Sequence, residues 1–408
     1  MSPAHRFAFL LMAGAITVTA CDQPTSTATA PNNSITDNAA ETPDLGFTGQ
    51  VGGPFSNLTA AERRQFFRGN VIFNTVFKPA TGLGPLFNSA SCASCHNIPV
   101  VGGSGIQVET HQTAFHGGTC DDLEEIGGQV IQDSVTPALR AALGISKEPL
   151  LAEANGTGHR TTPSILGFGL LEAVPDSVIL SHADPDDRDH DGVAGRAAVE
   201  PDGRVGRFGR KANAATLEAF QSGAFIYEMG ITNPLEPDEQ TIHGAPLPAG
   251  VDPTADPELS QAYLDATTVF TELLAPPSPA RFNLLALEGR RTFGRIGCAS
   301  CHIPSLPTGS TGGRAVRNKV VRAYSDLLLH DMGSALADIC LGQATPSEFR
   351  TEPLMGLRFR SRFLHDGRAA TIADAIRMHG GEGTGASNRF SSLSGRQRDE
   401  LLRFLRSL

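Results

Sequence analysis

Two short segments of the chain carry the same arrangement of thiol and imidazole side chains. Residues 92–96 and 298–302 both read Cys-Ala-Ser-Cys-His. Two thiols three positions apart can bond the two vinyl groups of one porphyrin, and the adjacent imidazole can bind its iron. The sequence therefore predicts two covalently attached c-type haems. Their attachment and ligand residues are Cys92, Cys95, His96, Cys298, Cys301 and His302.

Other uses of paired cysteines fit this chain less well. A thioredoxin-type redox pair is expected once, near a strand-rich pattern. A zinc ribbon keeps its two pairs within about 20 residues of each other, whereas these pairs lie in opposite halves of the chain. Three cysteines remain. Cys21 belongs to the N-terminal segment, and the even remainder, Cys120 and Cys340, suggests a disulfide in an exported protein, with two separate thiols as the alternative.

The first twenty residues have the layout of an export signal. Arg6 precedes an apolar stretch and then small residues, which is typical of a signal peptide at residues 1–20. The stretch ends Val-Thr-Ala-Cys, similar to a bacterial lipobox, which predicts lipidation of Cys21; ordinary cleavage before Cys21 is the alternative. Residues 21–50 are rich in Thr, Ser, Ala, Asn and Pro and are predicted to be a flexible tether. We therefore expect an exported, periplasmic lipoprotein anchored to a membrane.

Composition narrows the classes of function. The chain has 408 residues and a formal net charge of −10, and this acidity argues against nucleic-acid binding, because phosphate contacts need basic surfaces. Its 40% hydrophobic and 19% charged residues are ordinary for a globular protein. After residue 20 no apolar run reaches the roughly 18 residues that span a bilayer.

Helical patterns surround both motifs. A capping box at 59–62 opens a helix before the first motif, and a helical run over 282–296 precedes the second. Further helices are predicted at 212–228, at 258–275 and after Ser394, while strand signals are weak. We expect a mainly α, loop-rich fold with few short strands and two cytochrome c-like haem domains. The predicted regions are an N-terminal haem domain at 51–200, a helical connecting region at 201–280 and a C-terminal haem domain at 281–408.

Further segments carry a resemblance that covers most of residues 55–408. With the two haem motifs, they resemble the bacterial di-haem cytochrome c peroxidase superfamily, and within it most of all the di-haem oxidoreductase family of peroxidases, also labelled thiol oxidoreductases. The resemblance implies two haems whose irons have different ligands. One haem transfers an electron, and the other reacts with peroxide. The segments are 82–88 (Gly-Leu-Gly-Pro-Leu-Phe-Asn), 167–175, 229–232, 329–333, 349–351 and 363–368 (Phe-Leu-His-Asp-Gly-Arg).

The resemblance also implies a ligand set for the second haem. In the superfamily, His-Asp-Gly is followed fourteen positions later by the distal ligand of the C-terminal haem, and counting from His365 leads to His379. His302 and His379 are therefore expected to form a bis-His pair, which gives a lower potential than His/Met ligation. Met378 and Met332 are competing candidates for this ligand. If one of them binds the iron, His379 would instead lie at the surface or bond to a haem propionate.

The first haem leaves more alternatives open. His96 is its predicted proximal ligand, and His111 and His116 are distal candidates in the loop where the peroxidases carry a displaceable histidine. The resemblance makes Glu172 a candidate acid, because it follows Arg-Thr-Thr-Pro at a spacing similar to that of the superfamily's pocket glutamate. Reduction of peroxide needs a group that moves a proton between the two oxygens. In a water-poor pocket its pKa would rise. A structural ion pair for Glu172 and exposed positions for the two histidines are the alternatives.

Arginines and missing tryptophans add two expectations. Arg160, Arg350 and Arg368 are candidate partners for haem propionates, since a guanidinium pairs with a carboxylate in bidentate fashion; a solvated side chain is the alternative for each. The relatives carry Trp where this chain has Arg210 and Met355, and the chain has no Trp. Electron transfer between the haems through Trp is therefore excluded.

An acidic loop resembles the start of a calcium site. Asp187, Asp189 and Asp191 alternate before a glycine, as in an EF-hand loop, and are candidate calcium ligands. The twelfth position is Ala198, so the usual bidentate Glu is missing, and Glu200 or Asp184 could replace it. A solvated acidic loop is the alternative.

These observations favour one function over two others. We expect an exported di-haem c-type cytochrome oxidoreductase, an enzyme that reduces peroxide with electrons from a small donor through the bis-His haem. Its partners would be an electron-donor cytochrome or similar redox protein and, through the lipid anchor, a membrane. The alternatives are an electron-transfer cytochrome without peroxidase activity and a redox partner in metal uptake or protein modification.

Overall fold

The computed structural model describes residues 49–408, which fall within one compact unit. In this part of the chain, eleven α-helices are joined by long loops, and most of the ten strands have only two or three residues. This confirms the mainly helical, loop-rich fold. No helix in the described range is both long and apolar enough to cross a membrane. The predicted signal peptide, Cys21 and nearly all of the tether lie outside the described residues, and the division into two haem domains stays a prediction.

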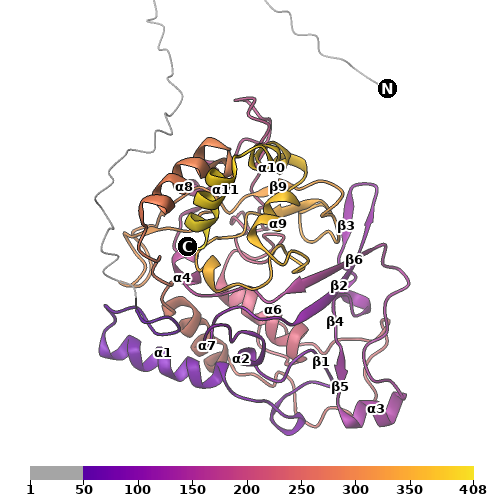
Figure 1. The fold of residues 1–408 in the computed structure, drawn as a ribbon. Helices are drawn as coiled ribbons and strands as arrows, with labels where there is room; N and C mark the ends of the chain where they lie inside the picture. The colour runs from indigo at the N-terminus through magenta and orange to yellow at the C-terminus, as the bar shows by residue number, and fades with distance from the viewer. Residues whose placement is uncertain (1–48) are drawn as a thin grey trace, which may run out of the picture. The chain divides into compact units, whose positions relative to one another are not determined.

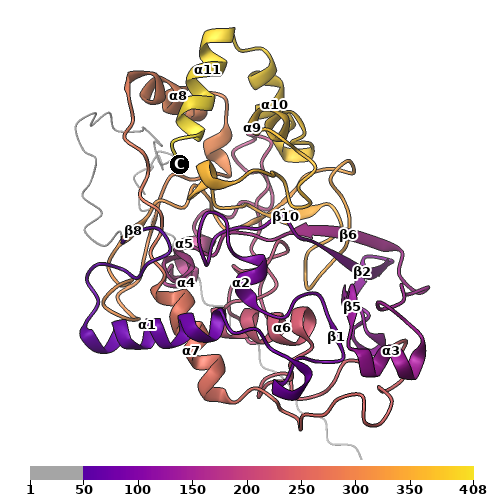
Figure 2. The same cartoon turned by 60° about the horizontal axis from the view of Figure 1, so that its bottom comes forward.

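The first helix is anchored by the predicted capping box. Helix α1 (Ala60–Phe73) begins after Thr59, whose hydroxyl accepts a bond from the Glu62 amide while the Glu62 carboxylate accepts one from the Thr59 amide. The helix packs along α7 (Gln261–Leu273), as Figures 1 and 2 show. The two helices approach closely at Gly69, where a Cβ atom would lie 1.9 Å from the Ala266 carbonyl oxygen. A larger residue there would separate the helices.

A third helix completes this layer. Helix α6 (Leu217–Met229) begins after Thr216, which caps it through the Ala219 amide, and packs against α7. The short helix α2 (Cys92–Cys95) carries the first motif and lies near α6 and α7 in both views (Figures 1 and 2). The motif is therefore held against a helical wall built from residues far along the chain.

A small antiparallel sheet flanks the first motif. Its central strand is β2 (Val108–His116), and the remaining strands are β3 (Thr119–Asp121), β4 (Gln129–Ile131) and β6 (Gly156–Thr161). Glu109 pairs with Arg160 in its register, and His111 with Gly158. The prediction that His111 and His116 lie in a loop is therefore wrong. Both belong to β2, because His111 pairs with Gly158 of β6 and Val130 of β4, and His116 pairs with Thr119 of β3.

The C-terminal helices gather on one side of the molecule (Figure 1). Helix α8 (Leu284–Arg295) packs against α11 (Gly395–Leu405), and the rings of Phe293 and Phe404 lie 5.5 Å apart. Tyr324 joins the same cluster. Helices α9 (Ile372–Arg377) and α10 (Thr384–Ser391) lie beside them, and together they surround the second motif.

Other short elements connect these layers. The two halves of the chain share the largest buried cluster, which includes Phe168, Phe208 and Leu328. A disulfide joins Cys120 to Cys340, with Cα atoms 5.7 Å apart. The remaining elements are α3 (Pro137–Leu143), α4 (Phe168–Glu172), α5 (Asp176–Leu180), β1 (Leu86–Phe87), β5 (Ser134–Val135), β7 (Leu306–Pro307), β8 (Val320–Val321), β9 (Leu329–Asp331) and β10 (Glu348–Arg350).

Candidate haem sites

A cavity lies beside the first Cys-x-x-Cys-His motif. It holds about 900 Å³ of empty space, which includes open solvent, and helices α2, α6 and α7 contribute its walls. Its lining is mostly apolar, as in cofactor sites generally. Thiol, imidazole and other polar side chains in the lining are Ser89, Ser91, Cys92, Cys95, His96, Glu109, Thr162, Gln221, Glu228, Thr267 and Thr271.

The imidazole of His96 is oriented as a metal ligand would be. Its Nδ1 lies 3.2 Å from the carbonyl oxygen of Gly103, to which it donates. Burial lowers the pKa of His96, which keeps the ring neutral. A neutral imidazole that donates from Nδ1 keeps its lone pair on Nε2, the atom that can bind iron.

The two predicted ligands of the second haem share this arrangement. His302 Nδ1 donates to the carbonyl oxygen of Tyr324 at 2.9 Å, and His379 Nδ1 donates to that of Ala375 at 2.7 Å. Burial lowers both pKa values, that of His302 to about 4, and His379 contributes to the shift of His302, so the two rings are neighbours. Three histidines predicted from the sequence thus each keep Nε2 available for iron, and the residues present fit the cofactor.

The four motif thiols lack the chemistry of a catalytic redox pair. All four are unpaired, and burial raises the pKa values of Cys92 and Cys298 to about 12. Catalytic or zinc-binding thiols need a lowered pKa. These buried, neutral thiols therefore do not act as thiolates on their own.

Two polar side chains on α6 also line the first cavity, and neither was predicted from the sequence. The amide nitrogen and oxygen of Gln221 are buried and have no hydrogen-bond partner. Burial, and then the neighbouring charge of Glu109, raise the pKa of Glu228 well above its ordinary value. Gln221 and Glu228 are seven positions apart, on the face of α6 that carries Leu217 and Ala224. Polar residues on that otherwise apolar stripe were the available signal.

The predicted catalytic residues lie around this cavity rather than in its lining. His111 Nε2 is 3.7 Å from Glu109, and both ring nitrogens are buried without a hydrogen-bond partner. His116 is exposed, and its ring contacts Asn155. The Glu172 carboxylate accepts a bond of 2.7 Å from the Leu217 amide at the start of α6, and burial raises its pKa. Among the lining residues, His96 is the only histidine.

The three predicted propionate partners have protein partners of their own. Arg160 pairs with Asp338 in the interior. Arg368 pairs with Asp366, and its side chain is 43% exposed. Arg350 is buried and lies 3.0 Å from the carboxylate of Glu352. Arg350 shares the carboxylate of Glu352 with Arg210 and Arg360.

The acidic loop brings its three carboxylates together. Ligand atoms of Asp187, Asp189 and Asp191 lie within 4.8 Å of one another, and Asp189 and Asp191 are exposed. Backbone amides inside the loop already bond to these carboxylates. The calcium site stays a prediction.

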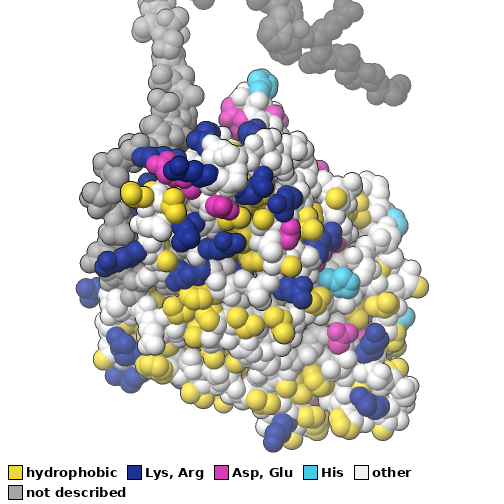
Figure 3. Space-filling model, viewed as in Figure 1, with side chains coloured by type: hydrophobic (Ala, Val, Ile, Leu, Met, Phe, Trp, Pro, Cys, Tyr) yellow, Lys and Arg dark blue, Asp and Glu magenta, His cyan; other side chains and the backbone are white. Residues whose placement is uncertain are grey.

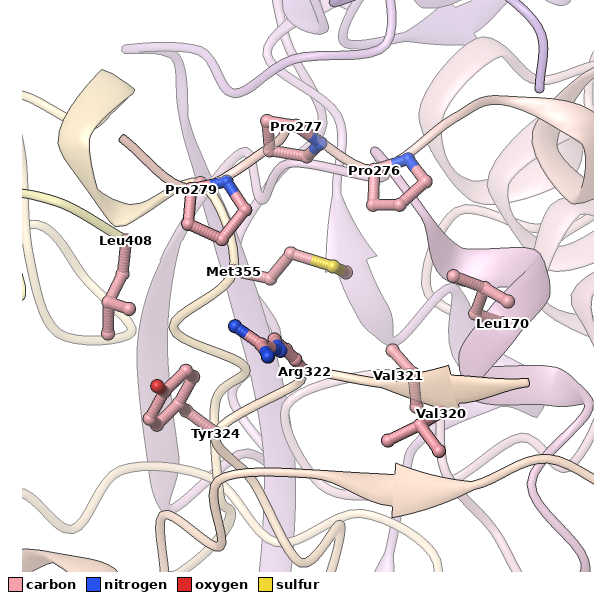
Figure 4. Close-up of a pocket in the computed structure, with 11 residues that line it drawn as sticks. Leu170, Pro276, Pro277, Pro279, Val320, Val321, Arg322, Tyr324, Met355 and Leu408 are labelled. Carbon is pink, nitrogen blue, oxygen red and sulfur yellow. The ribbon is translucent and has the colours of Figure 1, made fainter. Parts of the chain in front are cut away.

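The position of Met355 shows what stands in place of one expected tryptophan. Figure 4 draws a pocket in which Met355 lies between Leu170 and Tyr324, below Pro276 and Pro277. The pocket has about 400 Å³ of empty space, which includes open solvent. Tyr324, whose carbonyl oxygen orients His302, is the only aromatic residue in this lining.

Comparisons with known proteins place the chain in a family. The family model described as "Di-haem oxidoreductase, putative peroxidase" matches residues 144–408, which include His302 and His379; the first motif precedes the match. A search of curated proteins found no match. Similar solved structures include hydrazine synthase from Kuenenia stuttgartiensis, at 16% sequence identity and a TM-score of 0.38; the match covers 90% of this chain and 98% of that one. The diheme peroxidase BthA from Burkholderia thailandensis E264 is similar at 17% identity and a TM-score of 0.40, with 88% of this chain and 92% of that one covered. A MauG-like protein associated with microbial copper homeostasis is similar at 14% identity and a TM-score of 0.40, and the match covers 88% of this chain and 92% of that one. On the match to the family model, the chain belongs to the di-haem oxidoreductase family and its cofactors are haems.

Proposed function

We propose that the protein reduces peroxide at the first haem, with electrons that arrive through the second. Membership of the di-haem oxidoreductase family supports the cofactors and the redox chemistry. When bound, the haem in the first cavity supplies an iron at which peroxide accepts two electrons, and two protons must be delivered to release water. The side chains of this chain hold the haems and move those protons.

Attachment and ligation are assigned to the two motifs. Cys92 and Cys95 would form thioethers to the first haem and Cys298 and Cys301 to the second, since an unactivated thiol pair beside an available imidazole suits covalent attachment. His96 would bind the first iron. His302 and His379 would bind the second iron from both sides, which closes it to peroxide and suits it to electron transfer.

The observation that carries the proposal is the pair Gln221 and Glu228 in the cavity of His96. Burial and the charge of Glu109 raise the pKa of Glu228 and so favour its protonated form, which can donate a proton to a bound ligand and then act as a base. The unpartnered amide of Gln221 can orient a bound peroxide or water. A pure electron carrier has no use for an acid and an unpartnered amide in a cavity with open solvent.

The surface over the C-terminal helices supports an acidic electron donor. Figure 3 shows Lys and Arg side chains gathered over α8–α11, with fewer Asp and Glu among them. This basic face contrasts with the net charge of −10, and local patches rather than net charge steer docking. Its exposed arginines include Arg291, Arg295, Arg377, Arg389, Arg396, Arg403 and Arg406.

Export and anchoring are part of the same proposal. Haem c attachment takes place outside the cytoplasm, and the signal-like residues 1–20 with Cys21 after them would deliver the chain there and fix it to a membrane by its lipid. Calcium binding by Asp187, Asp189 and Asp191 is proposed as a structural addition.

One experiment tests the proposed function directly. The haem-loaded protein, reduced by one or two electrons, is mixed with hydrogen peroxide, and reoxidation is followed by stopped-flow absorbance. Rapid reoxidation that depends on peroxide concentration and slows in the Glu228→Gln variant supports the proposal. Reoxidation no faster than that of a bis-His cytochrome of similar potential would refute it.

A further inference from the structure

Three arginines surround one carboxylate in the interior of the protein. Arg210 Nη1 and Arg360 Nη1 each lie 2.7 Å from a Glu352 carboxylate oxygen, and Arg350 Nη2 lies 3.0 Å away. The three arginine side chains are 13%, 12% and 3% exposed, in the order Arg210, Arg360, Arg350. We call these four residues the arginine cluster. Its formal charge is positive by two.

A second group of buried charges next to it adds to the surplus. Asp338 is shared by Arg160 and by Lys211, whose Nζ is 3.5 Å away and whose side chain is 1% exposed. Lys211 follows Arg210 in the chain. The two groups together set five cations against two carboxylates, and buried charge without a counter-ion is strongly unfavourable. Burial accordingly lowers the pKa of Lys211 to about 7 and that of Arg210 to about 10.

The arginine cluster connects the surroundings of the two motifs. Arg210 Nη2 donates to the Thr161 carbonyl oxygen at 3.3 Å, and the next residue, Thr162, lines the first cavity. On the other side, Arg350 Nη1 and the Ser325 hydroxyl both donate to the Thr351 carbonyl oxygen.

Ser325 leads directly to the second motif. Its amide donates to the Ile303 carbonyl oxygen, and the amide of Asp326 donates to that of Cys301. The cluster therefore lies where two Arg-Thr-x-Pro segments, 160–163 and 350–353, come together, one beside each motif.

Several donors at this point lack an acceptor. The Nε atoms of Arg210 and Arg360 are buried without a hydrogen-bond partner, and so are the hydroxyl groups of Thr162 and Thr351. A guanidinium nitrogen can only donate, and a hydroxyl can also do so. Surplus positive charge and unused donors at one place call for an anion with several oxygens.

We propose that the arginine cluster binds propionate carboxylates of both haems, with Arg210 on the side of the first motif and Arg350 on the side of the second. This inference rests on the proposed di-haem function. Haem propionates are carboxylates, and guanidinium groups bind carboxylates through paired hydrogen bonds. The chain thus places a fixed positive charge between the surroundings of its two motifs. That charge favours the reduced state of a nearby haem, since reduction removes one positive charge from the iron.

The test is the pair of haem midpoint potentials, measured by spectroelectrochemistry on the haem-loaded protein. In Arg210→Gln, the equilibrium between reduced and oxidised forms of at least one haem is expected to shift tenfold or more toward the oxidised form. This corresponds to a midpoint potential lower by about 59 mV for a one-electron couple. Arg210→Lys, which keeps the charge, is expected to shift less. Arg64→Gln on the exposed surface of α1 is the matched control. If the redox equilibrium constants of both haems in Arg210→Gln stay within twofold of those in the control variant, the inference is overturned.

A second variant and an independent readout support this test. If Arg210→Gln does not fold, Arg360→Gln removes a charge from the same cluster, and the same shift is expected from it. The potentials do not depend on peroxide turnover. If the variant shifts the potentials but the protein does not react with peroxide, the arginine cluster is supported and the peroxidase function is rejected. If the potentials are unchanged in a protein that does reduce peroxide, the arginine cluster is rejected and the peroxidase function is supported.

Discussion

Glu109 and Glu228 share a hydrogen bond in the wall of the first cavity, although both are carboxyl groups. Two ionised carboxylates cannot make this bond, so the pair holds a proton. Burial and the charge of Glu109 raise the pKa of Glu228. Burial alone would raise the pKa of Glu109 as well, but the neighbouring His111 and the bond with Glu228 lower it. The shared proton therefore favours Glu228 over Glu109, and Glu228 lines the cavity.

Replacement of Glu228 tests the acid in the cavity. Glu228→Gln keeps the shape of the side chain and removes its titrating proton, and we expect peroxide-driven reoxidation to slow by about 10² to 10⁴-fold, the usual contribution of a general acid–base. Stopped-flow absorbance gives the rate. Glu172→Gln is the matched control, since Glu172 bonds to the Leu217 amide and does not line the cavity. A larger loss in Glu172→Gln than in Glu228→Gln would restore Glu172 as the catalytic acid.

Replacement of His379 tests the ligation of the second haem. His379→Gly leaves His302 without an imidazole opposite it, and we expect the second haem to change from low spin to high spin while both haems stay attached. The absorbance of the ferric Soret and charge-transfer bands reports this change. Met378→Leu is the control, because Met378 is the neighbouring competitor and is 41% exposed. If the second haem stays low spin in His379→Gly but becomes high spin in Met378→Leu, Met378 is the ligand instead of His379.

Charge reversal on the basic face tests the docking of an acidic donor. We expect Arg403→Glu/Arg406→Glu to slow reduction by an acidic cytochrome c about tenfold at roughly 10 mM salt, and the difference to vanish near about 0.5 M salt, where screening is strong. Arg63→Glu/Arg64→Glu on α1 carries the same change of charge on another surface and should have little effect. Equal slowing by both double variants would show that net charge, not this face, matters.

A buried glutamate away from both haems sets a pH dependence of stability. Glu148 accepts a bond from the Gln132 amide at 2.8 Å, and burial raises its pKa from 4.5 to about 8. Between these values the folded protein holds a proton that the unfolded chain has lost, so this group makes stability fall as pH rises, by at most about 1.4 kcal/mol per pH unit. Glu148→Gln should flatten the decline of the unfolding temperature between about pH 5 and 8 in calorimetry. Glu153→Gln, at an exposed position nearby, should leave it unchanged; an equal slope in wild type and Glu148→Gln would contradict the assignment.

Local patterns in the sequence predicted the features that local chemistry determines. The capping boxes at Thr59 and Ser394 are present, and the predicted helices correspond to α6, α7, α8 and α11, since caps and apolar spacing act within a few residues. The spacing of each Cys-x-x-Cys-His motif is likewise a local property.

Features that depend on distant segments were beyond local patterns. The prediction of a loop fails at His111 because that part of β2 pairs with β6, a strand that begins only at Gly156. His116, at the end of β2, pairs instead with Thr119 of the adjacent strand β3. Gln221 and Glu228 acquire a role only once α6 packs near α2, and Arg210 only once residues 161 and 352 meet around it. Such positions look like ordinary surface residues until the tertiary fold is known.

The low-temperature EPR spectrum of the oxidised, haem-loaded protein most directly tests whether one iron is open and the other closed. We expect one high-spin ferric signal from the first haem, whose cavity offers Glu228 and Gln221 rather than a second histidine, and one low-spin signal from the His302/His379 pair. Two low-spin signals that persist after the higher-potential haem is reduced would mean that neither iron opens, and the protein would then be an electron carrier.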